Sequence, residues 1–173
     1  MAKKIKSNLS IGQIRKLQQE IKALDKRIND KNVVFVRELA KLGIPIIDTK
    51  IAQAQGDSDK SHNTYIELTA GSTYVVGKLV VEGRDLLFIE FGAGVHYNGS
   101  VGTSPNPKGE ERGYTIGSYG LGKGSQDSWI YKAPTGEWVR SYGTEATMPV
   151  YSASQEIRDK IKETAKRVFC TNK

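Results

Sequence analysis

Two side chains suited to proton transfer stand close together in the stretch LLFIEFGAGVHYNG, residues 86–99. Glu90 ends an apolar run, and His96, one of only two histidines in the chain, follows a break at Gly92 and Gly94. A carboxylate and an imidazole can act as general acid and base. The chain has no Gly-x-Ser-x-Gly elbow, although spacing alone leaves open a serine and an aspartate that meet a histidine in space. We predict that the protein is not an enzyme, that residues 86–91 form the last strand of a sheet, and that the two glycines lead into a loop.

Metal and nucleotide sites are not indicated by the remaining residues. His62 and His96 are isolated, and the single Cys170 cannot supply a zinc cluster or an intrachain disulfide. The cluster GLGKGS at residues 120–125 resembles a phosphate-binding loop only superficially, because it lacks the required glycine spacing and the flanking strand and helix. We expect neither a metal nor a cofactor.

Aromatic and basic side chains alternate along residues 112–142, which makes this segment a candidate binding surface. Such a mixture can stack on nucleic-acid bases, form a protein interface, or simply pack a hairpin. The segment is nearly neutral overall, so we favour a protein interface. The residues predicted for a subunit or partner interface are Tyr97, Tyr114, Tyr119, Trp129, Tyr131, Trp138 and Arg140.

The net charge of +7 lies in the two ends of the chain. Residues 1–60 hold 13 basic and 7 acidic side chains, and residues 156–173 hold 6 and 3. A basic surplus suits a partner of negative potential, such as nucleic acid or an acidic protein ring, and it also suits a solvated helical surface. No apolar stretch is long enough for a signal peptide or a membrane span, so we expect no membrane contact and a reducing aqueous compartment.

Two helical segments are predicted near the N-terminus. Ser10 and Gln13 match a capping box, and apolar residues then follow at spacings of three and four. This heptad pattern predicts a helix that lies on the protein's own sheet or pairs with a neighbouring copy. Gly43 and Pro45 are expected to end the helical region, before a short helix or loop at residues 48–63. The heptad residues are Ile14, Leu17, Ile21, Leu24 and Ile28.

Strand patterns occupy the middle of the chain. Residues 64–68 and 73–82 predict two strands, with Gly77 a possible bulge, and residues 86–91 the third. Twelve of the 18 glycines lie between residues 92 and 143, which indicates a long functional or mobile loop. Within it, residues 128–143 predict a hairpin whose turn places Gly136 in the left-handed conformation.

The order of these elements predicts an α+β fold, in which an antiparallel sheet packs against a long N-terminal helix and a C-terminal helix capped by Ser152 or Ser154. A long Gly-rich loop and a β-hairpin complete it. We expect a single domain over residues 1–173. Its parts are residues 1–60, mainly helical; 61–92, sheet; 93–127, extended loop; 128–143, hairpin; and 149–170, the C-terminal helix.

Several short blocks together resemble a known family. The blocks are FIEFG at residues 88–92, WIY at 129–131, GEW at 136–138 and GTEATMP at 143–149, with a weaker match in PIIDT at 45–49. In this arrangement the chain resembles the tail-component family of long-tailed bacteriophages, which are tail-completion or head–tail joining proteins of the neck. It departs from the family pattern at Ala93, where threonine is usual, at Tyr151, and in a longer loop at residues 94–127.

The resemblance implies an α+β structural protein of the virion, without catalysis or cofactor. Such a protein forms a homo-oligomeric ring in the neck or tail region, and joins the head connector to the tail. Its partners would be other neck, connector and tail-tube proteins, with incidental contact to DNA in the channel, and it would reside in the host cytoplasm during assembly. The alternative function is a small basic nucleic-acid-binding protein.

Overall fold

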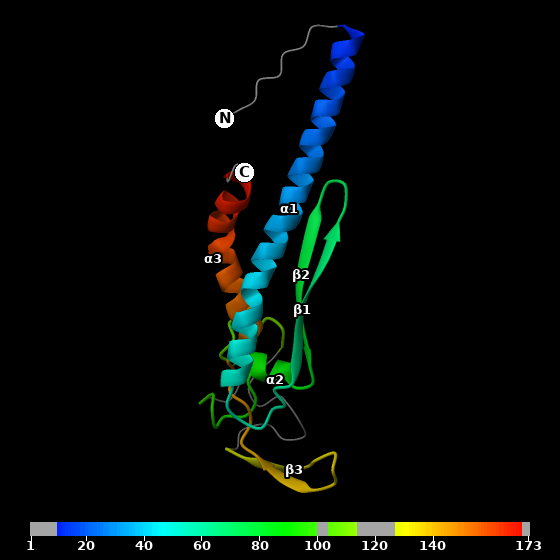
Figure 1. The fold of residues 1–173 in the computed structure, drawn as a ribbon. Coiled ribbons are helices and arrows are strands. Elements are labelled where there is room, and N and C mark those ends of the chain that lie inside the picture. The colour runs from blue at the N-terminus through cyan, green and yellow to red at the C-terminus, as the bar shows by residue number, and fades with distance from the viewer. Residues whose placement is uncertain (1–9, 100–103, 114–126, 171–173) are drawn as a thin grey trace.

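A computed structural model describes residues 10–99, 104–113 and 127–170, and it has the predicted α+β fold (Figure 1). A long helix runs beside a shorter one on one side and a two-stranded sheet on the other, and a second hairpin lies at one end. In chain order the elements are α1 (Ile11–Gln53), β1 (His62–Ala70), β2 (Val75–Gly83), α2 (Leu86–Phe91), β3 (Trp129–Lys132), β4 (Trp138–Ser141) and α3 (Pro149–Cys170).

Helix α1 continues through Gly43 and Pro45, so the prediction that these residues end the helical region is wrong. Gly43 is buried at a close approach, where a Cβ would overlap Leu79 of β2 and lie 3.4 Å from the Ala153 side chain of α3. Pro45 is exposed and forfeits one helical hydrogen bond. Burial of the apolar side of α1 against α3 and β2 therefore outweighs the local cost of both residues.

Strands β1 and β2 form an antiparallel hairpin that lies along α1 (Figure 1). Their pairing is continuous, with Leu68 opposite Gly77, so the predicted bulge is absent. Gly77 instead marks a second close approach, because a Cβ there would lie 2.5 Å from the Val36 side chain of α1. The lack of a side chain at this position allows β2 to approach α1 closely.

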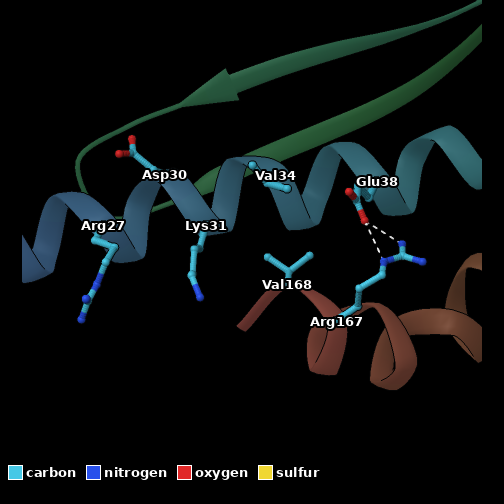
Figure 2. A pocket seen from close by; sticks show the side chains of 7 residues that line it. All are labelled: Arg27, Asp30, Lys31, Val34, Glu38, Arg167 and Val168. Atoms are coloured by element: carbon cyan, nitrogen blue, oxygen red, sulfur yellow. Dashed lines mark hydrogen bonds and ion pairs between the residues drawn. The ribbon is translucent and has the colours of Figure 1, made fainter. Parts of the chain in front are cut away.

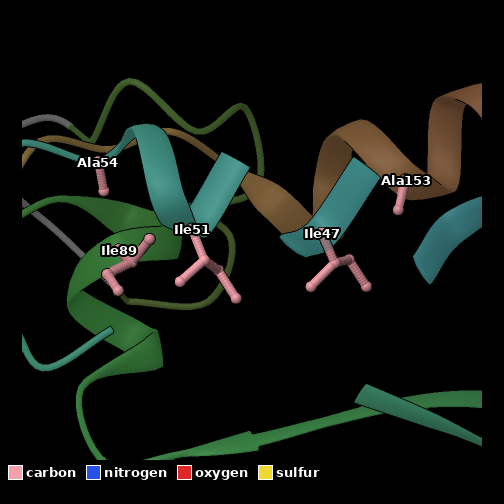
Figure 3. Packing of buried hydrophobic residues seen from close by; sticks show 5 residues of the cluster. All are labelled: Ile47, Ile51, Ala54, Ile89 and Ala153. Carbon is pink, nitrogen blue, oxygen red and sulfur yellow. The ribbon is translucent and has the colours of Figure 1, made fainter. Parts of the chain in front are cut away.

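Helix α3 runs antiparallel to α1. Ala153 near its start lies beside Gly43, while Phe169 near its end meets Phe35 with ring centroids 5.7 Å apart. An ion pair of 2.6 Å between Arg167 and Glu38 joins the same two helices. Both helices and the first hairpin enclose a small apolar core, whose centre comprises Ile47, Ile51, Ala54, Ile89 and Ala153 (Figure 3).

Residues 86–91 form the short helix α2, so the third strand predicted there is wrong. The amides of Phe88 and Ile89 bond to the Asp85 carbonyl, and Ile89 is fully buried in the core. A six-residue segment with five apolar residues does not distinguish a buried strand from one buried helical turn by its periodicity. The predicted sheet region 61–92 therefore holds two strands and a helix, and the described residues form two separate two-stranded sheets.

The hairpin predicted at residues 128–143 is confirmed as β3 and β4. Gly136 in its turn has φ +90°, the left-handed conformation that was predicted. The two strands lie at the opposite end of the molecule from the N-terminal end of α1 (Figure 1). Within the predicted extended loop, residues 93–99 and 104–113 are mainly turns and bends, and the remainder, apart from Asp127, lies outside the described residues.

Candidate functional site

The β3–β4 hairpin presents one face to solvent. Side chains alternate across paired strands, and Ile130 pairs with Arg140 while Lys132 pairs with Trp138. These four residues therefore share one face, which we call the hairpin outer face. Trp138 is 73% exposed and Ile130 is 58% exposed, values that are unusual for an indole and a branched aliphatic side chain.

The other face of the hairpin attaches it to the body. Trp129 is half-buried and lies over Gly94, where a Cβ would come within 2.8 Å of the indole ring. Ser141, its cross-strand partner, is buried. Tyr131 lies on this face as well but remains 40% exposed. The two tryptophans thus differ in role, since Trp129 anchors the hairpin and Trp138 is displayed.

A buried junction holds the base of the hairpin. Ala93 and Thr144 exchange backbone hydrogen bonds of 3.0 and 2.9 Å, and Asp57 accepts a 2.9 Å bond from the Tyr142 amide. Gly143 has φ +85°, and a Cβ on it would overlap the Ala93 carbonyl oxygen. Gly92, Gly94 and Gly143 are buried, so the expectation that the first two release the chain into an open loop is wrong; they let backbone segments meet.

Asn98 completes this junction with its side chain. Its amide group donates to the carbonyls of Gly94 and Thr144 at 3.2 and 3.0 Å, and its carbonyl accepts from the Ala146 amide at 3.0 Å. One side chain therefore ties the turn at 94–99 to the segment between β4 and α3. Sequence reasoning missed Asn98, because an asparagine in a glycine-rich stretch is ordinary turn composition.

Glu90 is a buried carboxylate that joins α2 to the start of α3. Its carboxylate accepts hydrogen bonds from the amides of Val150 (2.7 Å) and Tyr151 (3.0 Å) in the first turn of α3, and from the Asn106 side chain (2.7 Å). It thereby caps α3, the role that the sequence assigned to Ser152 or Ser154, which lie within the helix. Burial raises the pKa of Glu90, and these three hydrogen bonds act in the opposite direction.

His96 lies apart from the Glu90 hydrogen bonds. It is exposed, and its ring sits 4.7 Å from that of Tyr97 and 5.4 Å from that of Tyr142. Among the residues described, no hydrogen bond or ion pair joins Glu90 to His96. The second histidine, His62, contacts Asp48 at 3.1 Å, and Thr64 donates to the same oxygen. The structure therefore does not bring the candidate acid–base pair, Glu90 and His96, together.

The remaining predicted interface residues are distributed unevenly. Arg140 is exposed on the outer face and donates to the Ser128 hydroxyl at 3.2 Å, while Tyr97 is half-buried near the hairpin base. Tyr114 and Tyr119 lie outside the described residues. Ile130 was not predicted, although strand alternation from Trp138 and Arg140 signals it once the hairpin register is known.

Hollows in the described surface are open and lined by mixed side chains. One of about 440 Å³ lies over Glu90 and is bordered by Leu87, Arg112 and Tyr151. No group of three or more potential metal ligands occurs in the described part of the chain. Over the same residues, none of the helices has the length and hydropathy that crossing a bilayer requires. No family model, curated protein or solved structure matches the chain.

Proposed function

We propose that the protein is a structural assembly component that uses the hairpin outer face to dock on a neighbouring protein subunit. The observation that carries this proposal is the display of Trp138 and Ile130 on one face of a hairpin whose other face is anchored to the body. A two-stranded sheet is marginal alone, so packing against a partner would also stabilise it. Tryptophan and arginine are the residues that most often dominate binding energy at interfaces.

More specifically, we propose a virion protein of the phage neck that forms an oligomeric ring and joins the head connector to the tail. Two sequence blocks of the resemblance, FIEFG and GTEATMP, meet in the fold, because the Thr147 amide donates a 3.0 Å hydrogen bond to the Ile89 carbonyl, and this supports reading them as one unit. Glu90 of the first block caps the helix that begins at Pro149 in the last block, and Trp129 lies over Gly94, near the first block. The hairpin outer face is then the contact to a neighbouring subunit or neck protein.

The proposal is tested with Trp138→Ala in the full chain, with Thr135→Ala in the exposed turn of the same hairpin as control. We expect the wild type and the control to form a large assembled species, measured by mass photometry, and to be present in virions of the phage that encodes the chain. Trp138→Ala should keep the same circular dichroism spectrum and lose both. Assembly of Trp138→Ala at wild-type level would contradict the docking role.

A DNA retention assay separates this proposal from the nucleic-acid alternative. A nucleic-acid-binding protein should hold DNA at physiological salt, with affinity that falls steeply as salt rises. We expect retention only at lower salt, because two of the five α3 cations, Lys160 and Arg167, are paired with Glu163 and Glu38. Retention at physiological salt by a chain that forms no assembled species would overturn the structural role.

A further inference from the structure

The N-terminal part of α1 projects beyond the rest of the described chain (Figure 1). Asn29 donates a 3.2 Å hydrogen bond to the Ser72 carbonyl in the turn between β1 and β2, and Lys31 donates to the Phe169 carbonyl near the end of α3. Both neighbouring elements end at this level, while α1 runs on to Ile11. The projecting helix carries the heptad pattern.

Its apolar residues form one exposed stripe, which we call the seam and which comprises Ile14, Leu17, Ile21, Leu24 and Ile28. Exposure is 38% for Ile14, 52% for Ile21, 40% for Leu24 and 45% for Ile28. The same heptad face continues along α1 as Lys31, Phe35 and Glu38, and there α3 covers it through Phe169 and Arg167. The seam is therefore the uncovered continuation of an existing helix–helix interface.

We propose that a second copy of this chain covers the seam, with the two α1 helices antiparallel. Apolar residues at the first and fourth heptad positions suit packing against a second helix with the same spacing, and a second copy supplies that spacing. The charges beside the seam select the direction. In a parallel pair, Glu20 would face Asp25 of the partner subunit, and the same like-charge contact would occur twice.

In an antiparallel pair, charge also selects the register. One register places Ile21 opposite Leu24 of the partner subunit and Leu17 opposite Ile28 of the partner subunit. In this register Glu20 lies beside Arg27 of the partner subunit, and symmetry repeats the contact. A shift by one heptad, with Ile21 opposite Leu17 of the partner subunit, would place Glu20 beside the partner subunit's Glu20. Only the first register pairs opposite charges on that flank.

The favoured register also fits the shape of the molecule. It overlaps residues 14–31 of each copy, about 25 Å of helix, and leaves the two bodies at opposite ends of the overlap. Ile14 of the partner subunit would reach the level of Lys31, where α3 ends. There α1 and α3 leave a hollow of about 350 Å³ in which Val34 and Val168 lie beside Arg27 and Lys31, room that suits the end of an incoming helix (Figure 2).

The oligomeric state of the full chain tests the pairing, measured by sedimentation equilibrium over a range of concentrations. We expect a dimer that dissociates on dilution, because the paired segment is short. Leu24→Asp should weaken dimerisation at least tenfold, while Ala23→Asp, which introduces the same charge one residue away and off the seam, should leave it unchanged. A chain that stays monomeric at every concentration, or equal effects of the two variants, would overturn the proposal.

A charge swap tests direction and register. Glu20→Arg and Arg27→Glu should each weaken the dimer, and the double variant should restore it, because the charges across the helices are then reversed but again opposite. A parallel pair would instead be strengthened by Glu20→Arg alone, and that result would overturn the antiparallel arrangement. The inference does not rest on the neck function, so Trp138→Ala should leave the seam dimer intact.

Discussion

Glu90 lies where α2, the segment at 104–113 and the start of α3 meet, and its carboxylate bonds to two of the three. A residue that combines burial with three hydrogen-bond donors can be recognised as structural only when those donors are known. None of them is near it in sequence, since Asn106 is 16 residues and Tyr151 is 61 residues away. The sequence therefore marked Glu90 as unusual but could not distinguish a proton-transfer group from a helix cap.

The raised pKa of Glu90 predicts a pH dependence that belongs to this one side chain. Because burial raises the pKa in the folded state above the ordinary value of 4.5, the folded protein holds a proton in a range where the unfolded chain has released it. The stabilising contribution is therefore complete below the ordinary value and is lost as pH rises through the raised one. Glu90→Gln should remove this pH dependence of stability. Because the variant also loses an acceptor oxygen for the α3 amides, its unfolding free energy should fall by about 1–3 kcal/mol.

Urea denaturation of wild type and Glu90→Gln from pH 4 to pH 7 measures the effect. The difference in unfolding free energy should be larger at pH 4 than at pH 7. Glu110→Gln, an exposed carboxylate, serves as control and should change stability by less than about 0.5 kcal/mol. A difference for Glu90→Gln that stays constant with pH would contradict the assignment.

Two glycines allow the cost of a close approach to be separated from that of a backbone conformation. Gly143 and Gly136 both have positive φ, at +85° and +90°, but only Gly143 has a backbone atom where a Cβ would stand. We expect Gly136→Ala to cost about 1 kcal/mol and Gly143→Ala at least about 2 kcal/mol more. Thermal or urea unfolding of the two variants checks this, and equal losses would show that the junction adapts. In sequence the two residues look the same.

At the scale of elements, helix α1 shows why breakers predicted from local rules can be overridden. Gly43 and Pro45 lower local helix propensity, yet α1 extends ten residues past Gly43, to Gln53, and buries Ile47 and Ile51 in that part. Propensity can be read from the sequence, whereas the apolar contacts of Ile47 and Ile51 with α2 and α3 cannot.

The same limit explains α2, because a short apolar run can form either a strand or a helical turn until its neighbours are known.

Pro45→Ala should stabilise the protein. The substitution restores the missing amide and removes a ring from the interior of a helix at an exposed position. We expect the unfolding free energy to rise by about 1–3 kcal/mol, against about 0.5 kcal/mol for Thr49→Ala one turn further along, which changes helix propensity alone. Urea unfolding measures both. A loss of stability in Pro45→Ala would mean that the packing of α1 requires the geometry that proline imposes.

At the scale of the whole molecule, two exposed apolar surfaces lie at opposite ends of an elongated fold. The seam is near the start of α1, a helix about 65 Å long, and the hairpin outer face is beyond its other end (Figure 1). An antiparallel seam contact has two-fold symmetry and closes on itself, whereas a ring needs a contact between two different surfaces. The two surfaces can therefore serve separate assembly steps.

The sequence predicted both surfaces in part, because each has a local sequence pattern. Heptad spacing identified the seam, and the turn at Gly136 between two short apolar segments identified the hairpin. Whether these surfaces are exposed could not be predicted from the sequence. A heptad face on a core helix has the same spacing as a heptad face on a helix that projects into solvent. The division into two small sheets was beyond it as well, because it depends on α2 occupying the place of a third strand.

Separate surfaces predict separable defects. Leu24→Asp should abolish the seam dimer and leave the hairpin contact available, Trp138→Ala should do the reverse, and the double variant should be monomeric at all concentrations. Mass photometry of the four proteins, with Ala23→Asp plus Thr135→Ala as the matched control, measures this. A double variant that still associates would reveal a further interface on the described surface or elsewhere in the chain.

The capping of α3 by Glu90 has a consequence for amide hydrogen exchange. The first amides of a helix have no partner within it and ordinarily exchange with solvent quickly. In this protein the amides of Val150 and Tyr151 are held by a side chain 60 and 61 residues earlier in the chain, so they can exchange only when α2 and α3 separate. Their exchange rates therefore report the opening of that contact directly, without any label or substitution.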